Sequence, residues 1–174
     1  MERFKVIPSL TFVEALKLAL NNTLLFKGRS RRSEYWWTML AVFLVNVVFA
    51  FLPLLGWAIS ILAYIVTIPL TFRRLHDIGK SGWLFGISII MGIVVSCMLV
   101  YDCVLVGINS HNGFDYDMDS VYALLAGKYL LLFLCGAIYQ IVLLVFMCID
   151  SSKGSNKYGP SPKYVEYTES EVLG

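Results

Sequence analysis

Four long apolar segments constrain this chain more than any other feature of its sequence. They lie at about 35–52, 57–72, 83–101 and 129–149. A helix of roughly 20 residues crosses a hydrocarbon core of about 30 Å. Hydrophobic residues make up 58% of the 174 residues and charged residues only 15%, so polar side chains are too scarce to cover a soluble domain. The sequence therefore predicts an all-α membrane protein with four transmembrane helices, packed as a four-helix bundle.

The connections between the segments complete this architecture. The turn signal Pro53–Gly56 joins the first two segments in a tight helical hairpin. A polar outer loop, 102–128, joins the last two. We expect a single membrane domain over 1–164 and a flexible cytoplasmic tail over 165–174.

An amphipathic segment, at about 9–26, precedes the first span. Thr11 and Glu14 have the spacing of a capping box. Apolar residues recur at helical spacing on one face, and polar residues fall on another; the apolar set is Val13, Leu16, Leu20 and Leu24. This pattern predicts an interfacial helix that lies on the membrane, or a helix that packs on the rest of the protein; the two are compatible.

The distribution of basic residues predicts the orientation in the membrane. All 14 lysine and arginine residues except Lys128 fall on one side of the four spans. Cytoplasmic loops carry the excess of Lys and Arg. Both termini are therefore expected in the cytoplasm, which agrees with an even number of crossings.

Several functional classes have no support in the sequence. The net charge is only +2, so bulk electrostatics implies no nucleic-acid partner. The four cysteines form no C-x-x-C pair, and no nucleotide or dinucleotide motif is present. The aspartates Asp115, Asp117 and Asp119 alternate as in part of a calcium loop, but the later Gly and Glu are missing. We therefore expect no cofactor and no metal.

Small residues recur near the start of the third span. They are Gly82, Gly86, Ser88, Gly92 and Ser96. Small side chains let helix backbones approach closely in a membrane. We expect them to pack inside the bundle, or to form the interface of a homo-oligomer.

Three polar motifs lie on the predicted cytoplasmic side. They run over Phe26–Trp37, Pro69–Trp83 and Gly154–Pro162. They contain G-R-x-x-R-x-E-Y-W, R-R-L-H-D-x-G-x-S-G-W in a loop, and N-x-Y-G-P-x-P. In this order and spacing they resemble the bacterial inner-membrane family called domain of unknown function 805, over about residues 20–163. The resemblance implies a multi-span protein of the bacterial inner membrane and implies no reaction. The chain departs from the family pattern in its longer, acidic outer loop.

A cluster of charged residues in these motifs is the candidate site. Its members are Arg29, Arg32, Glu34, Arg73, Arg74, His76, Asp77 and Lys80. Charges near lipid are costly unless they are paired or wet, so we expect Glu34, Asp77 and Asp150 to neutralise some of the arginines. Such a cluster either locks the helices together or holds an anion, because guanidinium groups bind phosphate bidentately. A phospholipid headgroup is the natural anion at this depth.

The function that this reading favours is non-enzymatic. We expect an integral membrane protein whose Arg/His/Asp cluster binds an anionic lipid headgroup or a membrane protein partner. No catalytic residue is assigned, because adjacent His76 and Asp77 do not orient each other as a triad does; an acid–base pair acting on a lipid phosphate stays open. Further alternatives are an oligomeric channel or transporter, and a toxin-immunity or inhibitor protein that acts through the acidic outer loop.

Overall fold

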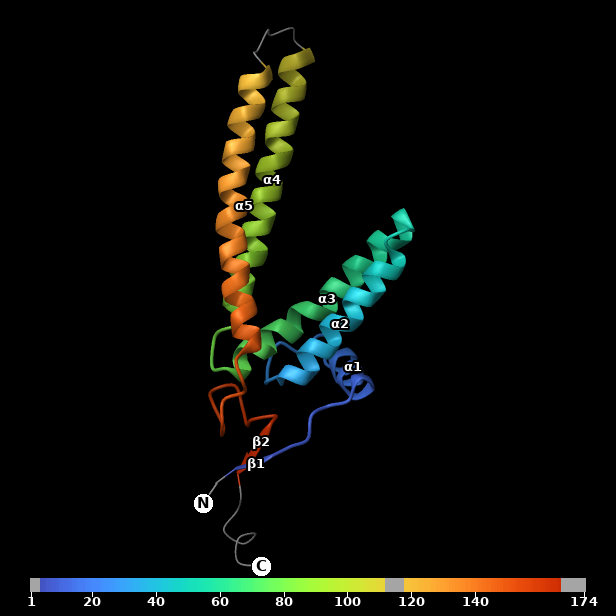
Figure 1. Ribbon diagram of the computed structural model, residues 1–174, viewed down its shortest axis with the longest axis vertical. Helices are drawn as coiled ribbons and strands as arrows, with labels where there is room; N and C mark the ends of the chain where they lie inside the picture. The colour runs from blue at the N-terminus through green and yellow to red at the C-terminus, as the bar shows by residue number, and fades with distance from the viewer. Residues whose placement is uncertain (1–3, 112–117, 167–174) are drawn as a thin grey trace, which may run out of the picture. The chain divides into compact units, whose positions relative to one another are not determined.

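The computed structural model describes residues 4–111 and 118–166 of the chain (Figure 1). These residues form five helices, α1 (Phe12–Asn21), α2 (Arg32–Phe49), α3 (Pro53–Asp77), α4 (Trp83–His111) and α5 (Met118–Cys148), and two short strands, β1 (Phe4–Val6) and β2 (Tyr164–Glu166). The predicted helical fold is confirmed, and the strands are an addition that the sequence did not predict. The described residues form two compact units: Leu84–Leu144, and the remaining residues up to Trp83 and from Val145.

Three of the described helices are long and apolar enough to cross a membrane. They are Leu54–Asp77, Trp83–Ile108 and Val121–Cys148. Helix α2, the predicted first span, is not among them. It has only 18 residues, about 27 Å of helix, and Arg32 and Glu34 occupy its first turn.

Helices α2 and α3 pack side by side as a hairpin (Figure 1). The turn between them comes earlier than Pro53–Gly56, because Pro53 is already the first residue of α3, where its missing N–H costs nothing. A Cβ on Gly56 would lie 2.4 Å from the Phe49 carbonyl oxygen. Glycine at this position therefore allows the two helices to approach closely.

Helix α3 extends beyond the predicted span, which was to end at Phe72. It continues through Arg73–Asp77 and stops just before Gly79, whose φ of 76° favours glycine. The R-R-L-H-D part of the second motif is thus the last turn of a helix and not a loop. Leu70 and Leu75 on these turns are fully buried.

Helix α1 has the predicted capping box. Glu14 accepts a hydrogen bond from the Thr11 backbone N–H, and Thr11 Oγ1 accepts one from the Glu14 N–H. The helix is shorter than the predicted 9–26. Its buried residues are the small Ala15 and Ala19, whereas most of the predicted apolar stripe faces outward, with Val13, Leu20 and Leu24 exposed.

Helices α4 and α5 form a second hairpin (Figure 1). Asp102 on α4 accepts hydrogen bonds from Lys128 Nζ and Tyr129 Oη on α5, each at 2.6 Å. Because α4 reaches His111 and α5 begins at Met118, most of the polar loop predicted over 102–128 is helical. The calcium-like aspartates Asp115 and Asp117 lie outside the described residues, as does the side chain of Asp119.

The small residues of the third span differ in their surroundings. Gly82 and Gly86 are buried, whereas Gly92 and Ser96 are exposed and Ser88 is half-buried. A Cβ on Gly82 would lie 2.2 Å from the Phe72 ring, so Gly82 packs against the end of α3. The hydroxyls of Ser88 and Ser96 bond to carbonyls of their own helix, those of Phe85 and Gly92.

The two strands join the ends of the described chain. Strand β1 pairs with β2 in antiparallel register, with Lys5 opposite Val165. The Ile7 N–H continues the ladder by donating to the Lys163 carbonyl at 2.9 Å. The N-terminal and C-terminal segments therefore lie next to each other.

Candidate functional site

The three polar motifs meet at the C-terminal end of α3. Arg29 from the first motif, Arg74 and Asp77 from the second, and the segment that leads to the third form one buried cluster. We call Arg29, Arg74 and Asp77 the clasp. The side chains of Arg74 and Asp77 are 0% exposed and that of Arg29 is 1% exposed.

Asp77 is the centre of the clasp. Its Oδ1 accepts a hydrogen bond from Arg29 Nε at 3.0 Å, and its Oδ2 accepts one from Arg74 Nη1 at 2.6 Å. The hydroxyl of Ser151 also donates to Oδ2, and that of Ser152 donates to the Asp77 carbonyl at 2.9 Å. A fully buried carboxylate is tolerated here because both oxygens have charged donors.

Arg29 attaches the segment after α5 to the clasp. Its guanidinium donates to the carbonyls of Ser152 at 2.8 Å, Gly154 at 2.9 Å and Gly159 at 3.2 Å. Gly154 and Gly159 have φ values of 72° and 126°, which residues other than glycine rarely adopt. These glycines let the backbone turn its carbonyls toward one guanidinium group.

Arg74 binds the C-terminal end of α5. Its Nε and Nη2 donate to the Met147 carbonyl at 3.3 and 3.2 Å, and Nη2 also donates to the Ile149 carbonyl. The last carbonyls of a helix lack partners within the helix and carry partial negative charge. Arg74 therefore satisfies the end of α5 while it pairs with Asp77.

His76 also joins the three motifs. Its Nδ1 lies 3.2 Å from the Gly28 carbonyl oxygen, and its ring stacks on that of Tyr158 at 3.8 Å. Asn156 Nδ2 donates to the His76 carbonyl at 3.0 Å. The side chain thus contacts the first motif and the third from the last turn of α3.

Arg73 and Glu34 form a second buried pair, between α3 and α2. Arg73 Nη2 lies 3.2 Å from Glu34 Oε1, but the N–H is not aligned for a hydrogen bond, so both atoms lack a hydrogen-bond partner. Arg73 Nε and the hydroxyl of Ser30 also lack one. All three side chains are buried.

The other predicted members lie apart from the clasp. Arg32 is exposed. Lys80 is also exposed, with its ammonium 5.8 Å from the Phe146 ring centre. Asp150 pairs with Lys163 instead of an arginine. Partial burial alone would raise the pKa of Asp150, but hydrogen bonds from Lys163, Tyr164 and the Ser151 N–H lower it to about 2.

Several residues of the site were not foreseen from the sequence. Ser151 and Ser152 follow α5 without any motif, and Arg31 was left out although it is buried and donates to the Ile7 carbonyl at 3.1 Å. Asn156 and Tyr158 did carry a signal, since both belong to the third motif that the sequence analysis singled out.

The charges buried in this region do not balance. Among the described residues, four arginines are buried, Arg29, Arg31, Arg73 and Arg74, against the two buried carboxylates Glu34 and Asp77. Asp150 does not correct this excess, because it is paired with Lys163. The excess positive charge lies beside the start of α2, the end of α3 and the end of α5.

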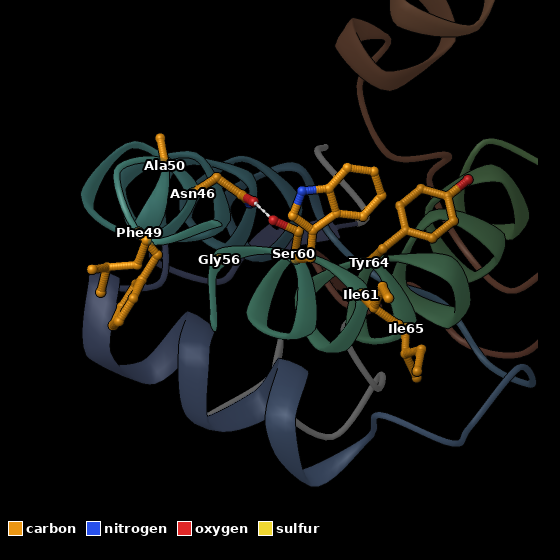
Figure 2. A pocket seen from close by; sticks show the side chains of 10 residues that line it. Asn46, Phe49, Ala50, Gly56, Ser60, Ile61, Tyr64 and Ile65 are labelled. Atoms are coloured by element: carbon orange, nitrogen blue, oxygen red, sulfur yellow. Dashed lines mark hydrogen bonds between the residues drawn. The ribbon is translucent and has the colours of Figure 1, made fainter. Parts of the chain in front are cut away.

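A groove of about 680 Å³ lies near the turn of the α2–α3 hairpin, away from this charge (Figure 2). The Ser60 hydroxyl donates to Asn46 Oδ1 there, at 2.5 Å. Tyr64, Ile61 and Ile65 line the groove, and none of its lining residues is charged. In the described part of the chain, no group of three or more His, Cys, Asp or Glu residues is placed to hold a metal ion.

Comparisons with known proteins agree with this arrangement of motifs. The family model described as "Protein of unknown function (DUF805)" matches residues 23–160. Inner membrane protein YhaH of Escherichia coli K12 is 27% identical over 160 residues, which covers 83% of this chain and 92% of the relative. Inner membrane protein YhaI of the same strain is 27% identical over 153 residues, with the same coverage. No solved structure matches the chain. Since the family model covers most of the chain, including the first two motifs and the third up to Pro160, the chain belongs to the DUF805 family of proteins of unknown function.

Proposed function

We propose that this protein is a four-span protein of the inner membrane, with both termini in the cytoplasm, which binds an anionic phospholipid where its helix ends meet. The proposed role is non-enzymatic. The observation that carries it is the excess of buried arginines over buried carboxylates at these helix ends.

The pairing of β1 with β2 supports the topology. Segments that pair at residues 4–6 and 164–166 lie on the same side of a membrane, which requires an even number of crossings. The three helices that meet the length and composition of a span are an odd number. Helix α2 packs along α3 and begins beside its end, as the Arg73–Glu34 contact indicates, so α2 is the fourth crossing. The excess of basic residues puts this end in the cytoplasm.

The charge argument favours an anionic lipid. Buried charge in a poorly hydrated region is costly without a counter-charge, and the cytoplasmic leaflet supplies negative headgroups. The clasp itself is unavailable, because Arg29 and Arg74 donate to protein atoms from every guanidinium nitrogen. Headgroup contact therefore falls to the cations around it, of which Lys27, Arg32, Lys80, Lys153 and Lys157 are exposed.

Helix α1 supports contact with the same membrane surface. It packs through Ala15 and Ala19 and leaves Val13 and Leu20 exposed. Trp37 Nε1 donates to the Leu10 carbonyl at 3.1 Å, which ties the start of α1 to the start of α2. An exposed apolar stripe beside a membrane-spanning helix is the feature of a helix that lies in the interface.

The contacts of the histidine argue against catalysis at this site. The ring of His76 is covered by Tyr158, and its Nδ1 faces a backbone carbonyl. Asp77 is held by two arginines and does not contact the imidazole through a hydrogen bond that the structure describes. This pair is not arranged as a general acid and base.

Native mass spectrometry from lipid nanodiscs tests the proposal. In mixed nanodiscs, we expect the wild type to retain phosphatidylglycerol in preference to phosphatidylcholine. The triple variant Lys27→Gln, Arg32→Gln, Lys80→Gln should lose most of this preference. Lys128→Gln removes a cation from α5, 20 residues before the end of that helix, and serves as the matched control. Equal lipid retention by all three proteins would contradict the proposal.

A further inference from the structure

We propose that the groove between α2 and α3 binds an isoprenoid quinone, a neutral membrane lipid whose ring carries two carbonyl acceptors, and that the Tyr64 hydroxyl donates a hydrogen bond to one of these carbonyls. The groove has a volume of about 680 Å³ and is lined by residues of both helices, which is within the range of about 300–1,000 Å³ for pockets that hold small molecules. This inference goes beyond the proposed function and does not depend on anionic lipid.

The groove runs into the membrane from the α2–α3 turn. Gly56 lines it near the start of α3, and Ile65 lines it farther along the same helix. These two residues are about 14 Å apart along the helix axis, nearly half of a hydrocarbon core of about 30 Å. An occupant of the groove therefore lies within the hydrocarbon of one leaflet and not only among the headgroups.

Tyr64 is the residue that indicates a ligand. It lies about 17 Å along α3 from Pro53 and about 14 Å from Arg73, near the middle of the span, whereas tyrosines of membrane proteins gather at the two interfaces. The residue is 50% exposed, and its hydroxyl makes no hydrogen bond to any residue that the structure describes. A polar group without a partner is costly at a depth where no water is available, which indicates an acceptor that comes from the lipid phase.

The neighbouring polar side chains are already paired with each other. Ser60 lies one turn before Tyr64 on the same face of α3, and its hydroxyl donates to Asn46 Oδ1 at 2.5 Å (Figure 2). Asn46 Nδ2 donates to the Val42 carbonyl of its own helix at 2.8 Å. This pair joins α2 to α3 and leaves the Tyr64 hydroxyl as a donor for a ligand.

The lining of the groove defines the charge of the ligand. None of the lining residues is charged, so an ionised group would have no counter-charge in a medium where charge is costly. The phosphates and ester carbonyls of phospholipids stay in the interfacial region, at the level of the α2–α3 turn. A quinone ring is neutral, is soluble in the hydrocarbon, and brings carbonyl acceptors to the depth of Tyr64.

Trp57 favours a planar ligand. It lies two turns from Tyr64, toward the α2–α3 turn, and lines the same groove. Its indole N–H makes no hydrogen bond within the described part of the chain, and the residue is 76% exposed. Planar rings attract each other in offset or edge-to-face arrangements, so Trp57 and Tyr64 together favour a ring over a saturated chain.

Photolabelling of the full-length protein in phosphatidylcholine nanodiscs tests the site. The probe is an azido derivative of ubiquinone with a tail of two isoprene units, and mass spectrometry of the peptides locates the label. We expect the label in the α2–α3 hairpin, near Ser60 and Tyr64. Unlabelled ubiquinone with the same tail should compete with the probe. Geranylbenzene, which has the same tail and an aromatic ring but no carbonyl, should compete about tenfold less well.

Two conservative variants isolate the hydrogen bond. Tyr64→Phe removes only the hydroxyl and should weaken ubiquinone binding by about tenfold. Tyr122→Phe removes the hydroxyl of an exposed tyrosine on α5 and should bind ubiquinone as the wild type does. Melting curves in the same nanodiscs show that both variants are folded.

A photoreactive amino acid in place of Ile61 reports what fills the groove. Ile61 lines the groove and is 58% exposed. We expect cross-links to phospholipid that decrease when ubiquinone is added. Cross-links to a second copy of the chain, or to another segment of the same chain, that ubiquinone does not reduce would overturn the proposal, because protein would then fill the groove.

Three further results overturn the quinone site: label outside the α2–α3 hairpin, equal competition by geranylbenzene and ubiquinone, and equal ubiquinone binding by Tyr64→Phe and the wild type. The proposed function stands or falls separately, on the preference for phosphatidylglycerol and its loss in the Lys27, Arg32 and Lys80 triple variant.

Discussion

Arg29 Nε lies 3.0 Å from Asp77 Oδ1, although the two residues are 48 positions apart in the chain. This contact joins the segment before α2 to the end of α3. Through the other nitrogens of Arg29 it also fixes the segment after α5. Three parts of a small membrane protein are thus held by one buried guanidinium group.

Replacement of Arg29 should therefore be strongly destabilising. Arg29→Ala leaves the Asp77 carboxylate with one charged partner and leaves several buried carbonyls without donors. Removing one member of a buried pair costs about 3–5 kcal/mol. Unfolding of the purified protein, followed by circular dichroism, measures this loss. Arg32→Ala, at an exposed arginine of the same segment, should change stability by less than about 0.5 kcal/mol; similar losses in both variants would argue against the clasp.

The stacking of His76 on Tyr158 should contribute less. Tyr158→Ala removes an aromatic contact at 3.8 Å, and such pairs are worth about 0.5–1.5 kcal/mol beyond the area that they bury. Tyr122→Ala removes a tyrosine that is 57% exposed and serves as the control in the same unfolding experiment. A loss in Tyr158→Ala as large as that in Arg29→Ala would show that the ring has a further role.

Gly82, just before α4, and Gly92, within α4, should respond differently to the same change. A Cβ on Gly82 would lie 2.2 Å from the Phe72 ring, whereas a Cβ on Gly92 meets nothing within 4 Å. Gly82→Ala should cost about 1–3 kcal/mol by overpacking. Gly92→Ala should be neutral or stabilising by up to about 1 kcal/mol, because alanine favours a helix. Melting temperatures of the two variants make the comparison, and a reversed order would contradict the packing described for α3 and α4.

The pair of Asp150 and Lys163 should make stability depend on pH in the acid range. Hydrogen bonds lower the pKa of Asp150 to about 2, from an ordinary 3.8. The group with the lowered pKa stabilises the folded state fully above pH 3.8, and this contribution is lost as the pH falls toward 2. The difference in melting temperature between the wild type and Asp150→Asn should therefore shrink over this interval. A difference that stays constant down to pH 2 would show that the pair does not stabilise the fold.

The proposed topology predicts the behaviour of reporter fusions. Alkaline phosphatase fused after Leu52, at the α2–α3 turn, should be active, because the proposed topology has that turn outside the cytoplasm. Fusion after Lys80, beside the clasp, should be inactive. A green fluorescent protein at the C-terminus should fluoresce. An inactive fusion after Leu52 would show that α2 does not cross the membrane.

Hydropathy and motif order were sufficient to predict the helical membrane fold, but not the end of α3. The sequence analysis ended the second span at Phe72 because charged residues follow it. Arg74 and Asp77 nevertheless stay in the helix, since protein groups from distant segments satisfy them. Hydropathy counts the charge of a residue and carries no information on its partners.

The ion pairs within the site could not be predicted for the same reason. The sequence indicated which charged residues could form ion pairs. The positions of these residues along the chain could not show that Asp77 pairs with Arg29 and Arg74, or that Asp150 pairs with Lys163. The strands β1 and β2 were missed because three residues each are too few for an alternating pattern. The two strands, which pair with each other, lie near opposite ends of the chain.

Thermal unfolding in nanodiscs of controlled composition tests the central claim, that anionic lipid balances the positive charge at the cytoplasmic helix ends. A ligand that binds only the folded state raises its stability. The melting temperature of the wild type should rise as phosphatidylglycerol replaces phosphatidylcholine, and the Lys27, Arg32 and Lys80 triple glutamine variant should lose most of this rise. Equal melting temperatures of the wild type in the two lipids would contradict the account.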